Sequence, residues 1–152
     1  MTILCEIVSQ DRTVFEGDVD IVVVPGAEGE MGILPDHSPL LSIIRLGVIK
    51  VRQGTEEHLF TVTGGLLEVQ PSIVTILADA AEDVDEINMA RAEEARERAR
   101  QRLAEGPAPG TEAYLAAEAA LRRSNLRLEA ARRLGGRRRD IASRAAGEGT
   151  SG

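Results

Sequence analysis

Hydrophobic residues in the first half of the chain come in short runs separated by turn residues. Runs rich in Val, Ile and Leu occupy residues 2–8, 20–25, 40–46, 48–53, 58–63, 66–70 and 72–78. Turn formers lie between them, as at Gly54-Thr55, Gly64-Gly65 and Pro71-Ser72. Many short apolar runs at close spacing predict the strands of a β-sandwich or barrel.

The pattern changes near residue 84. Residues 85–105 contain no β-branched run and are dense in Ala, Glu and Arg, which favour an α-helix. Asp83 followed by Glu86 resembles a capping box that would start this helix. Its apolar positions recur on one face, at Ala92, Ala95, Ala99 and Leu103.

A second helix is predicted after the segment GPAPG at 106–110, because two prolines cannot continue the first one. Thr111 is a suitable N-cap, and Leu134-Gly135-Gly136 a suitable end. A seam with a seven-residue period runs along this helix, at Tyr114, Ala117, Leu121, Ser124, Leu128 and Ala131. The seam holds few large side chains, so we expect two antiparallel helices that pack weakly.

These patterns predict a β + α fold class. An N-terminal antiparallel β-sandwich is expected over residues 1–84 and a C-terminal antiparallel two-helix hairpin over residues 85–134. Residues 135–152 are rich in Arg and Gly and are expected to form a disordered tail.

Charge is distributed unevenly between the two halves. The net charge is -7, and residues 1–83 hold fourteen acidic residues against Arg12, Arg45, Lys50 and Arg52. Residues 121–144 hold nine arginines against Glu129 and Asp140. This polarity predicts different partners for the two halves. The excess of acidic over basic residues and the aromatic content of 2% argue against nucleic acid as a partner. Binding of nucleic acid by the basic residues 132–144 is nevertheless kept as an alternative.

Catalytic and metal chemistry find no support in the motifs. His37 and His58 lie on different predicted elements, and the single cysteine, Cys5, cannot form an intramolecular disulfide. No CxxC, metal-ligand spacing or GxxxxGK[ST] loop is present. We therefore expect neither an enzyme nor a metal site.

Arginines of the two helices are the candidate anion ligands. Arg91 and Arg98 are two turns apart on the first helix, and Arg123 and Arg127 one turn apart on the second. Brought together by the helical hairpin, four guanidinium groups are suited to a polyphosphate. A nucleotide-binding module is thus an alternative to a purely protein-binding function.

The stretch PGAEGEMGILPDHSPLL at 25–41 is the most unusual of the first half. It is rich in glycine, but it is also acidic and has no lysine, so it does not suit phosphate. We expect a glycine-hinged loop with Glu30 and Met31 at its tip. A charged and an apolar residue side by side at a loop tip indicate a contact surface for another protein.

This stretch, together with GGLLEVQPSIVTILADAAE at 64–82, resembles the epsilon subunit of bacterial proton-translocating ATP synthases. The resemblance covers about residues 2–134. It implies a non-catalytic rotor subunit of the central stalk that couples the membrane c ring and the gamma subunit to the catalytic head. Such a subunit needs no cofactor. It is peripheral at the cytoplasmic face of the bacterial cell membrane and is held there only through the complex.

The resemblance also implies two sets of protein contacts. The contacts with the c ring and the gamma subunit would be Ser9, Glu30, Met31 and His37. The helical hairpin would restrain ATP hydrolysis when extended, with its basic second helix on an acidic segment of the catalytic beta subunit. The residues for that contact would be Arg122, Arg123, Arg127, Arg132 and Arg133. An exposed charge contact of this kind weakens with salt.

A regulatory ATP site is the last implication. Some bacterial members bind ATP at a motif Ile-Asp-x-x-Arg-Ala, and this chain has INMARA at 87–92, with Asn88 in place of the aspartate. The corresponding ligands would be Glu82, Asn88, Arg91, Arg98, Arg123 and Arg127. An asparagine keeps hydrogen-bonding capacity but loses a charge. An ATP-sensing helical hairpin therefore stands as the alternative function.

Overall fold

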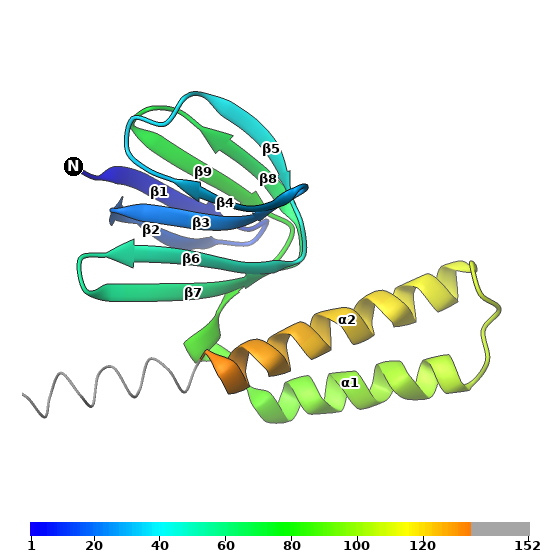
Figure 1. Cartoon of the computed structure of the whole chain (residues 1–152). Helices are drawn as coiled ribbons and strands as arrows, with labels where there is room; N and C mark the ends of the chain where they lie inside the picture. Colours follow the sequence, from blue (N-terminus) through cyan, green and yellow to red (C-terminus); the bar gives the residue numbers. More distant parts are fainter. Residues whose placement is uncertain (135–152) are drawn as a thin grey trace, which may run out of the picture. The chain divides into compact units, whose positions relative to one another are not determined.

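The computed structural model describes residues 1–134, in which the chain forms two compact units. The first spans Met1–Asp83 and consists of strands, and the second begins at Val84 and is helical (Figure 1). The tail predicted at 135–152 lies outside the described residues.

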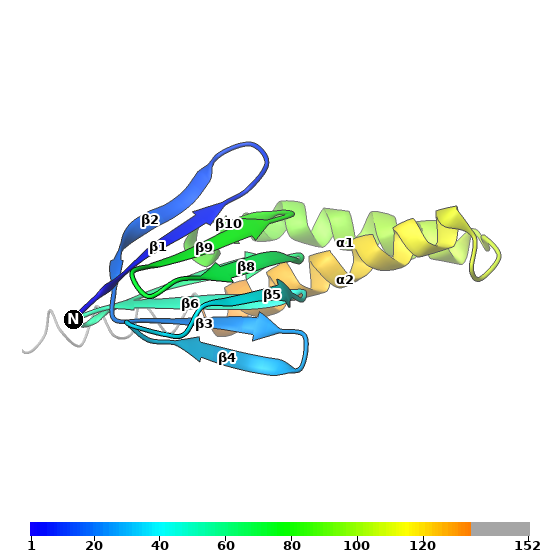
Figure 2. The same ribbon diagram turned by 90° about the horizontal axis from the view of Figure 1, so that it is seen from above.

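Ten strands form one continuous sheet that folds over itself (Figure 2). They are β1 (Ile3–Val8), β2 (Thr13–Val19), β3 (Ile21–Gly26), β4 (Gly29–Ile33), β5 (Leu40–Ile44), β6 (Gly47–Gln53), β7 (Glu56–Val62), β8 (Gly65–Val69), β9 (Ile73–Ala78) and β10 (Ala81–Asp83). Their order is β10-β7-β6-β3-β5-β8-β9-β1-β2, and β4 pairs with β3 off this path. Among these pairings only β1 and β9 run parallel.

Alternation along the strands builds the core. In β1, Ile3, Cys5 and Ile7 are buried while the residues between them are partly exposed. Such residues point to one face because successive side chains of a strand alternate. The sheet closes towards a barrel, since Gln53 Nε2 of β6 donates to the Asp18 carbonyl of the end strand β2 at 3.0 Å. The predicted β-sandwich is confirmed.

Three strands, β2, β4 and β10, were not predicted. The most consequential is β4, which lies inside the stretch 25–41, so its description as one long loop is wrong. Gly26 pairs with Gly29 across a turn at Ala27-Glu28, and Gly29 has a φ of 137°. Glycine adopts this conformation at little steric cost, which allows the tight β3–β4 turn. Glu30 and Met31 consequently lie in a strand opposite Pro25 and Val24, and not at a loop tip.

The second unit opens with a short 3-10 turn, η1 (Val84–Glu86), followed by α1 (Met89–Ala104) and α2 (Glu112–Arg133). The predicted capping box at Asp83 is wrong, because Asn88 caps α1: its Oδ1 accepts a hydrogen bond from the Arg91 backbone N–H at 3.1 Å. The predicted N-cap of α2 is confirmed, since Thr111 Oγ1 accepts from the Tyr114 N–H at 3.3 Å.

Small side chains form the seam between α1 and α2. Ala92, Ala99, Ala117, Ser124 and Leu128 are buried, as their spacing predicted. Ser124 satisfies its hydroxyl within α2 by donating to the Ala120 carbonyl at 2.9 Å. Only Leu128 among these is a large apolar residue, which leaves the helices with little apolar area to hold them together.

Candidate functional sites

The β3–β4 hairpin presents the first group of predicted contact residues. Glu30 is exposed, whereas Met31 is half-buried and packs against the core. The turn is so tight that a side chain on Gly26 would meet both the Gly29 carbonyl oxygen and Met31. The exposed carboxylate of Glu30 is thus held on a short, well-anchored strand, close to the turn.

The strand register decides which predicted contacts share an end of the sheet. Val8, which precedes Ser9, pairs with Leu77 of β9. The next residue of β9 pairs with Gly65 of β8. Gly65 in turn pairs with Ile44 of β5, and Ile44 pairs with Gly26 of β3. Ser9 and the β3–β4 turn therefore lie at the same end of the sheet, with β5, β8 and β9 between their strands.

His37 lies at the opposite end. It precedes Leu40, which pairs with Val69 at the far end of β5 and β8. Its segment is fixed to the β8–β9 turn, since the Asp36 N–H donates to the Pro71 carbonyl at 3.0 Å. Asp36 has a φ of 61°, a left-handed conformation that aspartate tolerates. The structure thus separates His37 from Ser9 and from the β3–β4 turn.

An exposed apolar surface on the sheet was missed by the sequence reasoning. Ile43, Leu66 and Leu77 lie in register on the neighbouring strands β5, β8 and β9 and are 64%, 38% and 49% exposed. Leu41, two residues before Ile43, is 66% exposed. We call these four residues the apolar row. The signal was present in runs such as LLSII, where both faces of the strand are apolar although only one can be buried in a two-layer sandwich.

Exposed apolar residues gathered across adjacent strands are typical of protein–protein contact surfaces. Isolated surface leucines need no explanation, but a row that the register places side by side does. The apolar row is therefore the best candidate for a docking surface on the sheet.

The helices carry the predicted anion ligands. Each of Arg91, Arg98, Arg123 and Arg127 immediately precedes a buried residue of the seam. In two antiparallel helices, residues with the same offset from the seam lie on the same side. These four residues therefore form one side of the helical hairpin, here called the cationic flank.

Two of the predicted ATP ligands, Asn88 and Glu82, are not arginines and do not belong to the cationic flank. Asn88 already uses its amide oxygen as the cap of α1. Glu82 belongs to β10, where it pairs with Thr61 in the sheet, and so lies in the other unit. Within the helical unit, the four arginines share one side of α1 and α2, and Asn88 lies at the start of α1.

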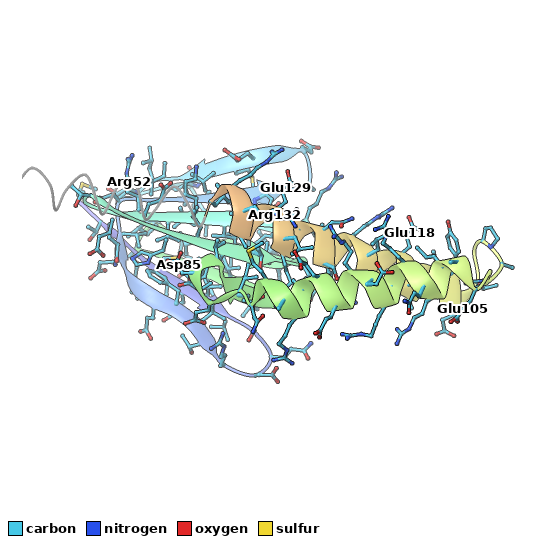
Figure 3. The ribbon with its side chains drawn as sticks, turned by 90° about the horizontal axis from the view of Figure 1, so that it is seen from below. Arg52, Asp85, Glu105, Glu118, Glu129 and Arg132 are labelled. Carbon is cyan, nitrogen blue, oxygen red and sulfur yellow. The ribbon has the colours of Figure 1, made fainter. Side chains whose placement is uncertain are left out.

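Arginines predicted to contact the beta subunit form ion pairs with glutamates of the two helices. Arg122 and Arg133 pair within α2, with Glu118 at 2.6 Å and Glu129 at 3.0 Å. Arg132 reaches across to Glu93 of α1 at 3.2 Å. Figure 3 labels Glu118, Glu129 and Arg132 along α2. Arg123 is exposed, and Arg127 is partly buried.

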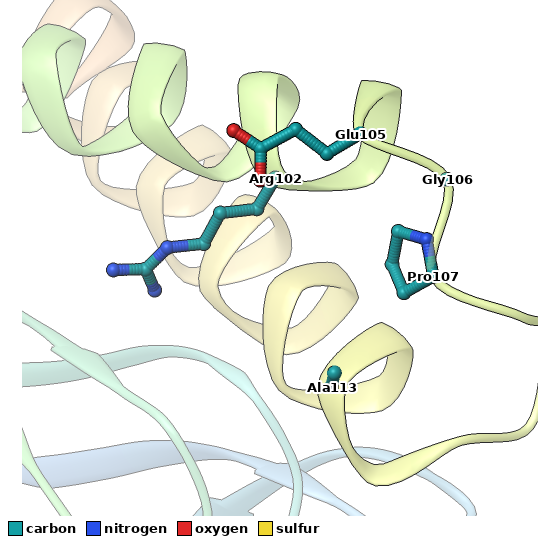
Figure 4. Close-up of a pocket in the computed structure, with 5 residues that line it drawn as sticks. All are labelled: Arg102, Glu105, Gly106, Pro107 and Ala113. Atoms are coloured by element: carbon teal, nitrogen blue, oxygen red, sulfur yellow. The ribbon is translucent and has the colours of Figure 1, made fainter.

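A shallow hollow lies at the turn between the helices (Figure 4). Arg102, Glu105, Gly106, Pro107 and Ala113 line it. It is wide open and brings together no pair of groups with evident acid–base or nucleophilic chemistry.

The remaining side chains of residues 1–134 give little indication of metal binding or of a reactive nucleophile. No three His, Cys, Asp or Glu side chains of this part of the chain are placed to hold a metal ion. Burial, with a smaller effect of the Glu6 charge, raises the pKa of the Cys5 thiol to about 12, so this thiol is unreactive at neutral pH. Neither α1 nor α2 contains a stretch apolar enough to span a bilayer.

The fold and its surfaces define a two-part protein: a β-sandwich that exposes an apolar row, joined to a helical hairpin with an arginine-rich second helix. Residues 2–84 match the family described as ATP synthase, Delta/Epsilon chain, beta-sandwich domain. Residues 85–132 match its counterpart, the long alpha-helix domain. The chain therefore belongs to the ATP synthase delta/epsilon family, and it is similar to the epsilon chains within it.

The alignments with related ATP synthase epsilon chains cover most of this chain and most of each relative. The ATP synthase epsilon chain of Dehalococcoides mccartyi (strain CBDB1) is 49% identical over 128 residues, which are 83% of this chain and 89% of the relative. That of Halalkalibacterium halodurans is 42% identical over 132 residues, 87% of this chain and 98% of the relative. The resemblance seen in the sequence is thus confirmed.

Solved structures agree with the fold. A chain of the Euglena gracilis mitochondrial ATP synthase, in a structure of OSCP, F1 and c-ring, superposes with a TM-score of 0.70 at 26% identity, covering 86% of this chain and 81% of that one. A chain from the central stalk and c-ring of the Tetrahymena thermophila enzyme gives a TM-score of 0.53 at 15% identity, covering 86% and 97%. Because its sequence identity is only 15%, the similarity to the Tetrahymena thermophila chain supports the fold alone.

Proposed function

We propose that this chain is a non-catalytic rotor subunit of a proton-translocating ATP synthase. It joins the membrane c ring and the gamma subunit to the catalytic head, from the cytoplasmic face of the membrane, and it restrains ATP hydrolysis through its helices. The observation that carries the proposal is the apolar row, which gives the sheet of a family member a surface suited to a permanent partner.

The apolar row is the contact with the gamma subunit. Obligate interfaces are more apolar than ordinary surface, and residues such as Ile43 and Leu41, about two-thirds exposed, gain most from being covered. His37 adds a polar contact at one end of the sheet. Ser9 and Glu30, near the other end, meet the polar loops of the c ring, where the exposed carboxylate suits basic residues.

An aspartate in the apolar row tests the docking surface. Ile43→Asp places a charge within the proposed interface and should weaken capture of the gamma subunit at least fivefold. Leu115→Asp is the matched control, because Leu115 is similarly exposed, at 56%, but lies on α2. Equal capture of gamma by the two variants would count against the assignment.

The helical hairpin is the restraint on hydrolysis. When extended, its second helix meets an acidic segment of the catalytic beta subunit through Arg122, Arg123, Arg127, Arg132 and Arg133. Support comes from the small-residue seam, which leaves α1 and α2 weakly packed, and from the five cations on one helix. Because these side chains are largely exposed, the restraint should weaken as ionic strength rises.

Truncation separates the two functions. The sandwich core lies within Met1–Asp83, so a chain lacking residues 85–152 should fold and assemble. The assembled complex should hydrolyse ATP faster than the complex with the full chain. Loss of assembly, or unchanged hydrolysis per complex, would contradict this division of roles.

The second candidate is ATP sensing by the helical hairpin, which the cationic flank favours. Four guanidinium groups on one side of two helices suit the phosphates of ATP. Isothermal titration of the purified chain with ATP should show saturable binding that Arg98→Ala abolishes. Asn88→Asp keeps the oxygen that caps α1 and restores the acidic ligand of the motif, so it should tighten binding. No Arg98-dependent saturation up to millimolar ATP would remove this candidate.

A further inference from the structure

The ion pair between Arg132 of α2 and Glu93 of α1 differs from the pairs that Arg122 and Arg133 form within α2. Arg122–Glu118 and Arg133–Glu129 are four residues apart on one helix, so they persist wherever that helix goes. Arg132 and Glu93 are 39 residues apart and lie on different helices, with Nη2 and Oε1 separated by 3.2 Å. Separating α2 from α1 breaks this pair and leaves Arg122–Glu118 and Arg133–Glu129 intact.

The pair spans the open end of the helical hairpin. Glu93 lies one turn into α1, and Arg132 lies in the last turn of α2. Each directly follows a seam position, Ala92 or Ala131, which places both on one side of the two helices. Residues of the cationic flank precede seam positions, so that flank is on the other side. Nucleotide bound there and the Glu93–Arg132 pair can therefore hold the helices independently.

We infer that Glu93 and Arg132 form a latch that keeps the helical hairpin closed without nucleotide and withholds Arg132 from its acidic partner on the enzyme. The inference rests on the proposed function, because it names how contact with that partner is regulated. Glu93 occupies Arg132 in the closed state. The acidic segment of the beta subunit must compete with Glu93 before Arg132 takes part in inhibition.

The expected strength of the latch follows from its exposure. The side chains of Arg132 and Glu93 are 54% and 49% exposed, so solvent and salt screen their attraction. An exposed pair of this kind should change the ratio of open to closed helical hairpin by about 1.5- to 5-fold. A shift of this size is enough to tune a weakly packed seam without locking it.

The conformational test uses the isolated full-length chain. Spin labels at Ala90→Cys and Asn125→Cys report opening, since one site lies on α1 and the other on α2, and the distance between them increases when the two helices separate. Glu93→Gln should raise the open fraction, and Glu97→Gln, which removes the same charge one turn further along α1, should not. Labelling is selective in a Cys5→Ala background.

A charge swap then distinguishes attraction from other effects of substitution. Glu93→Arg combined with Arg132→Glu should restore the closed population, and 0.5 M salt should erase the differences between variants. Equal open fractions in Glu93→Gln and Glu97→Gln, or no recovery in the swap, would overturn the latch.

Measurements on the assembled enzyme separate this inference from the proposed function. Glu93→Gln should inhibit hydrolysis more strongly than the unaltered chain, whereas the swap, closed but lacking Arg132, should inhibit less. If truncation after residue 84 leaves hydrolysis unchanged, the proposed function fails while the label distances still decide the latch. If Glu93→Gln opens the helices but leaves inhibition unchanged, the withholding of Arg132 is wrong.

Discussion

Leu128→Ala is the sharpest test of how the helical hairpin is held. Leu128 is 2% exposed and is the largest side chain that this unit buries fully within the described residues. Its buried neighbours along the seam are alanines and one serine. Truncating a buried leucine costs about 2–5 kcal/mol, because transfer free energy is lost and a cavity remains. Even 2 kcal/mol raises the open fraction about thirtyfold.

Hydrogen exchange measured peptide by peptide is the appropriate assay. Amides of α1 and α2 should lose protection in Leu128→Ala by about that factor, while amides of β1 and β9 should not change, because the sandwich core is a separate unit. Leu115→Ala is the control: the same truncation on the same helix at a site 56% exposed should cost less than about 0.5 kcal/mol. Unchanged helical protection, or equal loss in helices and strands, would refute the reasoning.

Three further predictions concern local features. Gly65→Ala should destabilise the sandwich by about 2–4 kcal/mol in chemical denaturation, because φ is 152° and a Cβ would collide with the Leu77 carbonyl oxygen; Gly54→Ala, also at positive φ but facing open space, should cost only about 1 kcal/mol. Cys5 stays neutral in the folded state up to its pKa of about 12 but ionises near 9.0 when unfolded. The free energy of unfolding should therefore fall between these values by up to about 1.4 kcal/mol per pH unit, a slope that Cys5→Ala should lack. Asn88→Ala should cost about 1 kcal/mol by removing the cap of α1, seen as faster exchange in its first turn, whereas Asn88→Asp should keep the cap.

Local signals in the sequence accounted for much of the fold. Seven of the strands follow from apolar runs, and the helices follow from their Ala-, Glu- and Arg-rich composition and their periodic seam. Thr111 was identifiable as a cap because its side chain acts on the backbone only three residues away. The strand β4 was not identifiable, since Gly29, Glu30 and Gly32 disfavour strands and only pairing with β3 holds them extended.

The amino-acid sequence alone determined the division into a strand-rich acidic part and a helical arginine-rich part. It also determined which residues are available for contacts. Periodicity and composition are local properties, so they can be read directly. Only the tertiary structure decided the neighbours: Ser9 and the β3–β4 turn at one end of the sheet with His37 at the other, the apolar row across β5, β8 and β9, and Glu93 against Arg132. Strand register and helix packing bring together residues far apart in the chain, and no local pattern specifies which partner each will find.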